Sequence, residues 1–266
     1  MNSLQRTYST MLKKSRTALI VVIVAIFLTT IAFAGPIEDC KEYSRLGIPS
    51  KQGKLLCRKG FLLAYSDEHK TPIWVIEFLT ADKAKGNLPT NSKYQPDPDL
   101  KKGAQAELDD YKNSDYKMGQ MALAATMKWD QKALEESFYL SNIIPQVDGG
   151  MNRGIWKLIE ERIRDYAINR EAIYIFTGPI YEDVVKKTIG SNKVAIPSHI
   201  FKIIYDPYKV EARALIIPNE ELNAANYHKY FVTIRDIERK TGLNFLSKLN
   251  EKVHDVVDNQ KAQGLW

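Results

Sequence analysis

The chain has 266 residues, of which 44% are hydrophobic, 10% aromatic and 26% charged, which is ordinary for a globular protein and enough for one large domain or two small ones. Its 38 basic and 32 acidic residues give a net charge of +6. Four of the basic residues and none of the acidic ones lie in residues 1–34, so the remaining 34 basic and 32 acidic residues differ by two charges. This small excess excludes overall basicity as an argument for nucleic-acid binding; only a local patch could supply the attraction.

Residues 1–34 have the pattern of an export signal. A basic stretch ends at Arg16, an apolar run extends from Ala18 to Ala34, and Ala32 and Ala34 place small residues where a signal peptidase cleaves. An uncleaved membrane anchor is the alternative, although the run is at the short limit for crossing a bilayer. We expect cleavage, and therefore an exported protein, periplasmic or secreted, with no membrane contact afterwards.

Cys40 and Cys57 are the two cysteines of the sequence, and both follow the predicted signal. An even pair of cysteines in an oxidising compartment predicts a disulfide. The two cysteines are 17 positions apart, and closing a loop of that length contributes roughly 3 kcal/mol to stability on the chain-entropy estimate. Two unpaired buried thiols are the alternative.

The first half of the remaining chain mixes strand and helix patterns. Leu55–Tyr65 and Thr71–Leu79 are rich in aliphatic and aromatic residues and predict two paired strands joined by a short polar turn. Residues 86–103 contain three prolines and predict an irregular loop. Met127–Phe138 and Asn152–Ala167 have the apolar spacing of helices.

The second half adds three strands and a short helix that ends at Gly242: Ala172–Pro179, Ser198–Asp206, Glu211–Pro218 and Ile234–Leu243. Strands and helices do not alternate strictly, which favours an α+β fold over a doubly wound parallel sheet. We therefore predict a single domain over residues 35–248, with a central, mainly antiparallel sheet flanked by helices. A polar helical tail is expected over residues 249–266.

Chemistry is concentrated on the helix that begins near Asn152. Asn152, Trp156, Glu160 and Arg164 follow one another at spacings of four residues and lie along one face. Asparagine and glutamate oxygens are hard ligands that suit Mg²⁺. Arg164 would hold the Glu160 carboxylate or bind a phosphate. Taken alone, however, these two residues are better explained as an ordinary surface ion pair on an amphipathic helix.

Neighbouring motifs favour the functional interpretation. SFYLSNIIPQ (Ser137–Gln146) precedes Asn152 by six residues, and DYKMGQMA (Asp115–Ala122) precedes that motif. Downstream stand FTGP, IPSHIFK, IPN and IERKTGL, at residues 176–179, 196–202, 217–219 and 237–243. In this order and spacing, from about Cys40 to Phe245, the chain closely resembles the DNA/RNA non-specific endonuclease family, which has a ββα-metal active site.

The resemblance implies a role for each polar residue of the helix. Asn152 would hold one divalent ion, Mg²⁺ with Mn²⁺ as an alternative, which stabilises charge on the scissile phosphate. Glu160 would orient metal-bound water without binding the ion directly. Arg164 would contact phosphate. Asn142 would help to position the base and the substrate, which the resemblance implies to be DNA and RNA.

The chain departs from the family at the catalytic motif. Where members typically have Asp-Arg-Gly-His, it has Lys117-Met118-Gly119-Gln120. Histidine is the general base because its pKa lies near the operating pH, whereas the Gln120 amide can only orient water. The proline-rich loop also lacks the arginine that many members place there. Lys93 and Lys117 would restore positive charge to the substrate site, but not the bidentate fork of arginine.

Three interpretations therefore stay open. The first is an active nuclease in which Gln120, Asn142, Glu160 and Arg164 form the catalytic set. The second is a catalytically impaired relative that binds nucleic acid or a protein partner, and the third is a structural protein of the envelope. Many members of the family dimerise, so a homodimer is compatible with each of them.

Overall fold

Apolar runs in the chain form a seven-stranded sheet in the order β1-β2-β3-β6-β9-β10-β11, in which every neighbouring pair is antiparallel. The computed structural model describes residues 40–182 and 187–266, and the strand count refers to these. The described residues form one compact unit, and the predicted export signal lies outside them. The predicted α+β fold with a central antiparallel sheet is confirmed.

The elements have the following bounds. The main sheet contains β1 Lys54–Cys57, β2 Phe61–Ser66, β3 Thr71–Thr80, β6 Ala172–Ile180, β9 His199–Asp206, β10 Glu211–Pro218 and β11 Phe231–Val232. Two separate pairs are β4 Tyr116–Gln120 with β5 Ile143–Val147, and β7 Thr188–Ile189 with β8 Val194–Ala195. The α-helices are α2 Lys41–Ser44, α3 Ala81–Ala84, α4 Leu108–Tyr111, α5 Gln131–Glu136, α6 Lys157–Ile168, α7 Ile234–Thr241 and α8 Glu251–Asn259. The 3₁₀ turns are η2 Ala124–Thr126, η3 Leu140–Asn142 and η5 Ala224–Tyr230, and η4 Asp148–Trp156 is π-helical.

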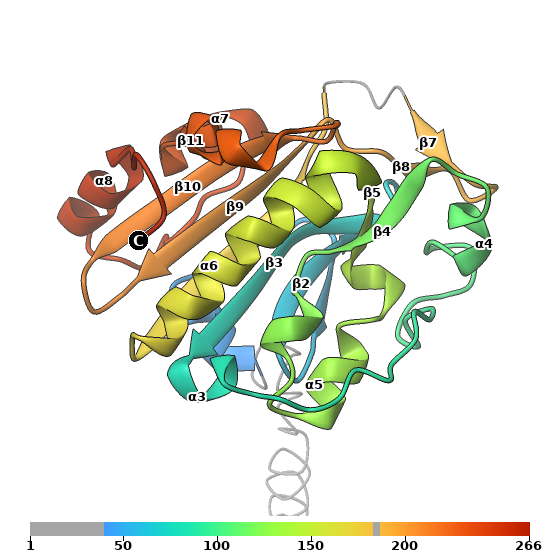
Figure 1. The fold of residues 1–266 in the computed structure, drawn as a ribbon, viewed down its shortest axis with the longest axis horizontal. Coiled ribbons are helices and arrows are strands. Elements are labelled where there is room, and N and C mark those ends of the chain that lie inside the picture. The colour runs from blue at the N-terminus through green and yellow to red at the C-terminus, as the bar shows by residue number, and fades with distance from the viewer. Residues whose placement is uncertain (1–39, 183–186) are drawn as a thin grey trace, which may run out of the picture. The chain divides into compact units, whose positions relative to one another are not determined.

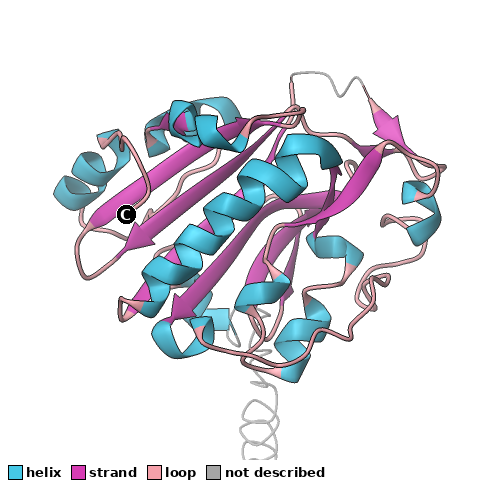
Figure 2. Cartoon of the chain, in the orientation of Figure 1, coloured by secondary structure: helices cyan, strands magenta, loops and turns pink. Residues whose placement is uncertain are grey.

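Helices cover both faces of the main sheet, as Figures 1 and 2 show. Successive side chains of a strand point to opposite faces, so β3 contributes to two cores. Val75 packs in one core with Ile159 and Ile163 of α6, and Trp74 packs in the other with Ile237 of α7. The regularly spaced apolar residues that predict the helix over Asn152–Ala167 therefore form its core-facing side.

The β4–β5 pair leads directly into the long helix formed by η4 and α6 (Figure 1). Gln120 lies opposite Ile143 in this pair, and Lys117 lies opposite Gln146. The arrangement is the ββα motif that the resemblance implies. The helix begins earlier than predicted, at Asp148, and its first turns are π-helical, a rare geometry that is frequent at functional sites.

Two predicted elements differ from the structure. Leu55–Tyr65 is not one strand but two, because the chain reverses direction between Arg58 and Phe61 and the two parts pair with each other. The backbone N–H of Arg58 closes the turn by donating to the Phe61 carbonyl at 2.9 Å. The helix predicted over Met127–Phe138 is limited to Gln131–Glu136. Its start is fixed by Asp130, whose carboxylate accepts a hydrogen bond from the backbone N–H of Ala133 at 2.9 Å.

The predicted disulfide between Cys40 and Cys57 is present, with a Cα–Cα distance of 5.8 Å. At the other end of the chain, α8 forms and the segment after it packs against α6. Trp266 stacks on Tyr166 with ring centroids 3.6 Å apart, and Ala262 is buried. Among the described residues, no helix combines the length and apolar character needed to cross a membrane.

Candidate active site

The residues predicted to form a site lie on three consecutive parts of the ββα motif. Gln120 ends β4, Asn142 ends η3 immediately before β5, and the other three lie on the helix: Asn152, Glu160 and Arg164. Because β4 pairs with β5 and β5 leads into η4, the fold gathers segments that are up to forty-four residues apart in sequence into one unit.

Asn152 lies half-buried in the π-helical turn. Its side-chain nitrogen donates to Oε1 of Gln146 at 2.6 Å, and Gln146 itself is fully buried on β5. Since its nitrogen is held, Asn152 keeps its amide oxygen for another partner, and a neutral oxygen suits a hard divalent cation. Nε2 of Gln146 is buried without a hydrogen-bond partner among the described residues. A ligand that completes these contacts would explain the unpaired atom.

Gly119 makes the Gln146 arrangement sterically feasible. A Cβ atom added at Gly119 would overlap the side-chain amide of Gln146. A glycine in the Lys117-Met118-Gly119-Gln120 segment is therefore required by its surroundings, because it leaves room for the Gln146 side chain that orients Asn152.

Glu160 is 8% exposed, and its Oε1 lies 3.8 Å from Nζ of Lys202 on β9. Burial raises the pKa of Glu160 to about 8, although the charge of Lys202 opposes the shift. Lys202 is 2% exposed, donates to Oγ1 of Thr177 at 3.1 Å and lies 4.5 Å from the ring centroid of Trp156. The Glu160 carboxyl group therefore faces a lysine of the sheet as well as Trp156 of its own helix.

A second buried carboxylate, Glu77 of β3, shares the same lysine. Oγ1 of Thr126 donates to Glu77 at 2.7 Å, and burial raises the pKa of Glu77 to about 7 while Lys202 opposes the shift. Two acids and one ammonium group thus lie between the sheet and the helix. Sequence reasoning missed Glu77 and Lys202. Their one signal was a charged residue inside an apolar strand, WVIEFL and IFKIIYD.

Arg164 is half-buried one turn beyond Glu160 on α6. Because Glu160 pairs with Lys202, Arg164 is not the residue that neutralises this carboxylate in the described part of the chain. Nε of Arg164 is buried without a hydrogen-bond partner there. A guanidinium group with an unpaired N–H is suited to bind an incoming anion such as phosphate.

Gln120 has both ends of its amide bound to backbone. Its Nε2 donates to the Ser137 carbonyl at 3.0 Å, and its Oε1 accepts from the N–H of Ala124 at 3.1 Å. Successive residues of a strand point to opposite faces, so Gln120 and Gly119 lie on opposite faces of β4. The Gly119 face is the one next to Gln146. Among the described residues, no hydrogen bond joins Gln120 to that second glutamine.

Asn142 is fully buried and also binds backbone only. Its Nδ2 donates to the carbonyls of Ala122 and Ser137, and its Oδ1 accepts from the N–H of Ala122, each at 2.8 Å. The Ser137 carbonyl thus accepts from both Asn142 and Gln120. The structure brings these two predicted residues together, but through a carbonyl that they share.

The two predicted substrate-binding lysines are exposed. Lys117 lies on β4, opposite Gln146 in the strand pair. Lys93 lies in the proline-rich loop beside Tyr94, whose hydroxyl donates to the Met118 carbonyl at 3.3 Å. The loop is therefore attached to β4, and both lysines belong to the same part of the molecule.

In residues 40–182 and 187–266, one group of three histidine, cysteine or acidic side chains lies close enough together to hold a metal ion, and it consists of Glu238, His254 and Asp258. Arg235 lies 3.1 Å from Glu238 and 3.3 Å from Asp258, and Nε2 of His254 lies 2.8 Å from the Phe245 carbonyl. Since Arg235 already supplies the positive charge, we assign these residues to an ion-pair network that joins α7 to α8.

The sequence matches a known family over most of its length. The profile of the DNA/RNA non-specific endonucleases aligns with residues 41–252. The chain belongs to that family. Nuclease C1 of Cunninghamella echinulata var. echinulata is 31% identical over 221 residues, which cover 77% of this chain and 88% of the relative. Mitochondrial endonuclease G of Homo sapiens is 29% identical over 222 residues, or 78% and 74% of the two chains.

Solved structures of the non-specific endonuclease family agree with the fold. A chain in the crystal structure of the EndoG/EndoGI complex has 28% sequence identity and a TM-score of 0.76, covering 80% of this chain and 94% of that one. The family assignment supports phosphodiester hydrolysis as the activity and nucleic acid as the ligand. Among the buried polar atoms without a hydrogen-bond partner in the described residues, those of Gln146, Glu160 and Arg164 lie on the β5–α6 part of the motif.

Proposed function

We propose that this chain is a divalent-metal-dependent endonuclease that hydrolyses phosphodiester bonds in DNA and RNA without sequence specificity. One observation carries the proposal: Asn152 is oriented by Gln146 so that its oxygen stays available, on the same helix as Glu160 and Arg164. A neutral oxygen, a nearby carboxylate and an unpaired guanidinium nitrogen fit a hydrated Mg²⁺ ion or Mn²⁺ ion next to a phosphate.

Each residue then has a physical task. A divalent ion bound at Asn152 would supply Lewis-acid stabilisation of the scissile phosphate. Arg164 binds a phosphate oxygen through its guanidinium, and Lys117 and Lys93 attract the polyanionic backbone. Glu160, held by Lys202, orients water at the site, and its raised pKa lets it keep or release a proton near neutral pH.

Gln120 supplies no general base in this proposal. It replaces the family's histidine and cannot take up a proton near neutrality, so hydrolysis proceeds without the roughly 10²–10⁴-fold acceleration that such a base typically gives. Gln120 and Asn142 instead hold the backbone at Ser137, which sets the position of the turn before β5.

A second candidate is a nuclease-fold protein that binds nucleic acid or a protein partner without cleaving. The observation that favours it is the Gln120 amide, whose two ends bind the backbone of Ser137 and Ala124. A side chain engaged in this way contributes to the fold rather than to chemistry.

Plasmid DNA and RNA incubated with the purified protein in Mg²⁺, in Mn²⁺ and in excess EDTA separate the two candidates. Metal-dependent cleavage that Asn152→Ala abolishes supports the nuclease. The matched control is Asn169→Ala, which removes an exposed asparagine at the far end of the same helix. Binding of labelled nucleic acid by folded protein, without cleavage at any metal concentration, overturns the first candidate in favour of the second.

We also propose that the protein acts outside the cytoplasm, periplasmic or secreted. The Cys40–Cys57 disulfide and the signal-like pattern of residues 1–34 support this location. Cell fractionation with N-terminal sequencing of the mature protein tests it. An intact N-terminus in the cytoplasmic fraction contradicts the proposal.

A further inference from the structure

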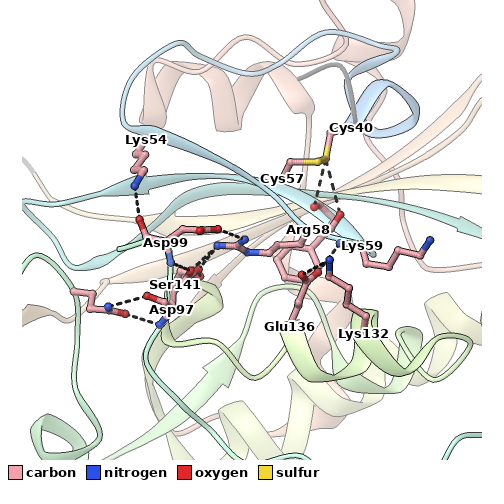
Figure 3. A network of polar contacts seen from close by, with 12 residues as sticks. Cys40, Lys54, Cys57, Arg58, Lys59, Asp97, Asp99, Lys132, Glu136 and Ser141 are labelled. Carbon is pink, nitrogen blue, oxygen red and sulfur yellow. Dashed lines mark hydrogen bonds and ion pairs between the residues drawn. A yellow bond between two sulfur atoms is a disulfide. The ribbon is translucent and has the colours of Figure 1, made fainter. Parts of the chain in front are cut away.

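A buried ion pair connects the disulfide-bonded part of the chain with the turn that carries Asn142 (Figure 3). Arg58, next to Cys57, is 7% exposed, and its Nη2 lies 2.6 and 2.5 Å from the carboxylate oxygens of Asp97. The Asp97 carboxylate also accepts a hydrogen bond from the hydroxyl of Ser141, the residue before Asn142. We refer to Arg58, Asp97 and Ser141 as the Asp97 network.

Asp97 is held on every side. The backbone N–H of Asp99 donates to its Oδ1 at 2.9 Å, and the Gln105 amide binds its backbone N–H and carbonyl at 2.7 and 3.0 Å. The second terminal nitrogen of Arg58 binds the Asp99 carboxylate at 2.6 Å, but the Asp99 side chain is 59% exposed. The guanidinium therefore has one buried contact, which continues to Ser141, and one exposed contact, which does not.

The network joins two segments of the proposed substrate site. The proline-rich loop of residues 86–103, which carries Lys93, binds the turn before β5 through its backbone. Gln95 donates to the Phe138 carbonyl at 3.2 Å, and Leu140 donates to the Gln95 carbonyl at 2.9 Å. The bond from Ser141 to Asp97 is the side-chain contact that continues this attachment to the residue next to Asn142.

Net stability is a weak explanation for such a pair. The desolvation cost of a buried ion pair offsets most of the attraction between its charges, and replacement by apolar residues is often neutral. What the pair does supply is a fixed geometry, because both Asp97 oxygens bind Nη2 of Arg58 while Nη1 of the same guanidinium binds Asp99. The groups held in this geometry are the Ser141 hydroxyl and the backbone of the proline-rich loop.

We infer that Asp97, oriented by Arg58, is a positioning residue for nucleic-acid cleavage: it holds Ser141 and thereby fixes Asn142 and the proline-rich loop in one geometry. This inference rests on the proposed function. Asn142 in turn holds the Ser137 carbonyl, to which Gln120 also donates. A loosened Ser141 therefore displaces the β4 end of the site without touching the metal-binding helix.

Ser141→Ala tests the inference with the smallest change, since it removes one hydroxyl and leaves the ion pair intact. We expect kcat to fall about 10-fold with little change in KM, because small misplacements at a reaction centre cost rate more than binding. Asp99→Ala is the matched control. It removes the exposed contact of the same guanidinium, and kcat should stay within about two-fold of the wild type.

A second measurement does not depend on cleavage. Hydrogen exchange of the amides of residues 138–142 should be faster in Ser141→Ala than in Asp99→Ala, at a temperature at which both variants are folded. Arg58→Lys, which keeps the charge but loses the fork, should give the same local increase and a similar loss of kcat.

The outcomes are separable. Unchanged kcat in Ser141→Ala, or an equal loss in Asp99→Ala, overturns the positioning role while leaving the proposed function in place. A wild-type protein that cleaves nothing overturns the proposed function, and the catalytic part of this inference with it. Unchanged exchange in Ser141→Ala then overturns the geometric part as well.

Discussion

The two halves of the candidate site differ in how their polar groups are used. At the end of β4, Gln120 and Asn142 direct every amide atom to backbone groups of neighbouring turns. On the β5–α6 side, buried polar atoms of Gln146, Glu160 and Arg164 have no hydrogen-bond partner among the described residues. Buried polar groups are rarely left unpaired without a reason.

The difference indicates which half receives a ligand. A ligand that brings a cation and a phosphate would complete the contacts of the β5–α6 half, whereas the β4 half has none to complete. The amides of Gln120 and Asn142 bind backbone groups only, so this half contributes to the fold and to the position of the turn before β5. Substitutions on the β5–α6 side should therefore cost mainly activity, and those on the β4 side mainly stability.

The largest expected effect is on activity, in Asn152→Ala. Loss of the metal ligand should lower cleavage about 1000-fold or more, since Lewis-acid stabilisation is worth several kcal/mol and each 1.4 kcal/mol is about ten-fold. The unfolding free energy in EDTA should change by less than about 1 kcal/mol, because one half-buried hydrogen bond is lost. Plasmid cleavage and urea unfolding measure the two. A loss of stability without a loss of activity would make Asn152 structural.

Asn142→Ala should cost mainly stability, with a loss of kcat that is smaller than in Asn152→Ala and follows from the positioning of the turn before β5. Three hydrogen bonds to buried backbone groups disappear, so the unfolding free energy should fall by about 3 kcal/mol. Urea unfolding of this variant beside Asn152→Ala provides the comparison directly. Equal stability of the two variants would contradict the division of the site into a structural half and a ligand-binding half.

Gln120→His should change activity by a smaller amount. A histidine restores a group that can accept a proton, but it must leave the contacts that Gln120 makes with Ser137 and Ala124. We expect about a 10-fold gain in kcat, below the usual worth of a general base, and a new pH dependence near the histidine pKa. No gain in a metal-dependent wild type would show that position 120 does not face the reacting water.

The fold was largely predictable, because its long strands consist mainly of apolar residues. Ala172–Ile180, His199–Asp206 and Glu211–Pro218 agree with prediction to within one residue at each end. Helix α7 ends before Gly242, whose positive φ of 69° suits glycine. The split of Leu55–Tyr65 was not predictable, since the Arg58 turn that divides it carries a side chain paired with a residue 39 positions away.

The candidate site was predictable only where it follows local spacing. The helical spacing that links Asn152, Glu160 and Arg164 gave that side of the site. The contacts of Lys202 and Gln146 depend on how strands from distant parts of the chain meet, and no local pattern encodes this. A single lysine within an apolar strand, such as Lys202, predicts that the residue lies at an edge or on the surface of the sheet. Only its partner, Glu160, shows why it is buried.

The smallest expected effect is a pH dependence of stability that belongs to the ligand-binding half. Burial raises the pKa of Glu160 to about 8 and that of Glu77 to about 7, against 4.5 for an ordinary glutamate. Near pH 7 the folded protein therefore holds more protons than the unfolded chain. Stability must then fall as the pH rises through the folded pKa values, by about 1 to 2 kcal/mol between pH 7 and pH 9.

The pH window from 7 to 9 lies above the pKa values of the other carboxyl and histidine groups that burial shifts. Burial raises the pKa of Asp258 only to about 6 and lowers the pKa values of His69 and His199, so these groups contribute little to the slope. Urea unfolding in EDTA at several pH values measures the slope. Glu160→Gln should flatten it, whereas Glu161→Gln, at the exposed neighbouring position, should leave it unchanged. An equal slope in wild type and Glu160→Gln would mean that Glu160 is ionised beside Lys202, and that this half of the site is as fully paired as the other.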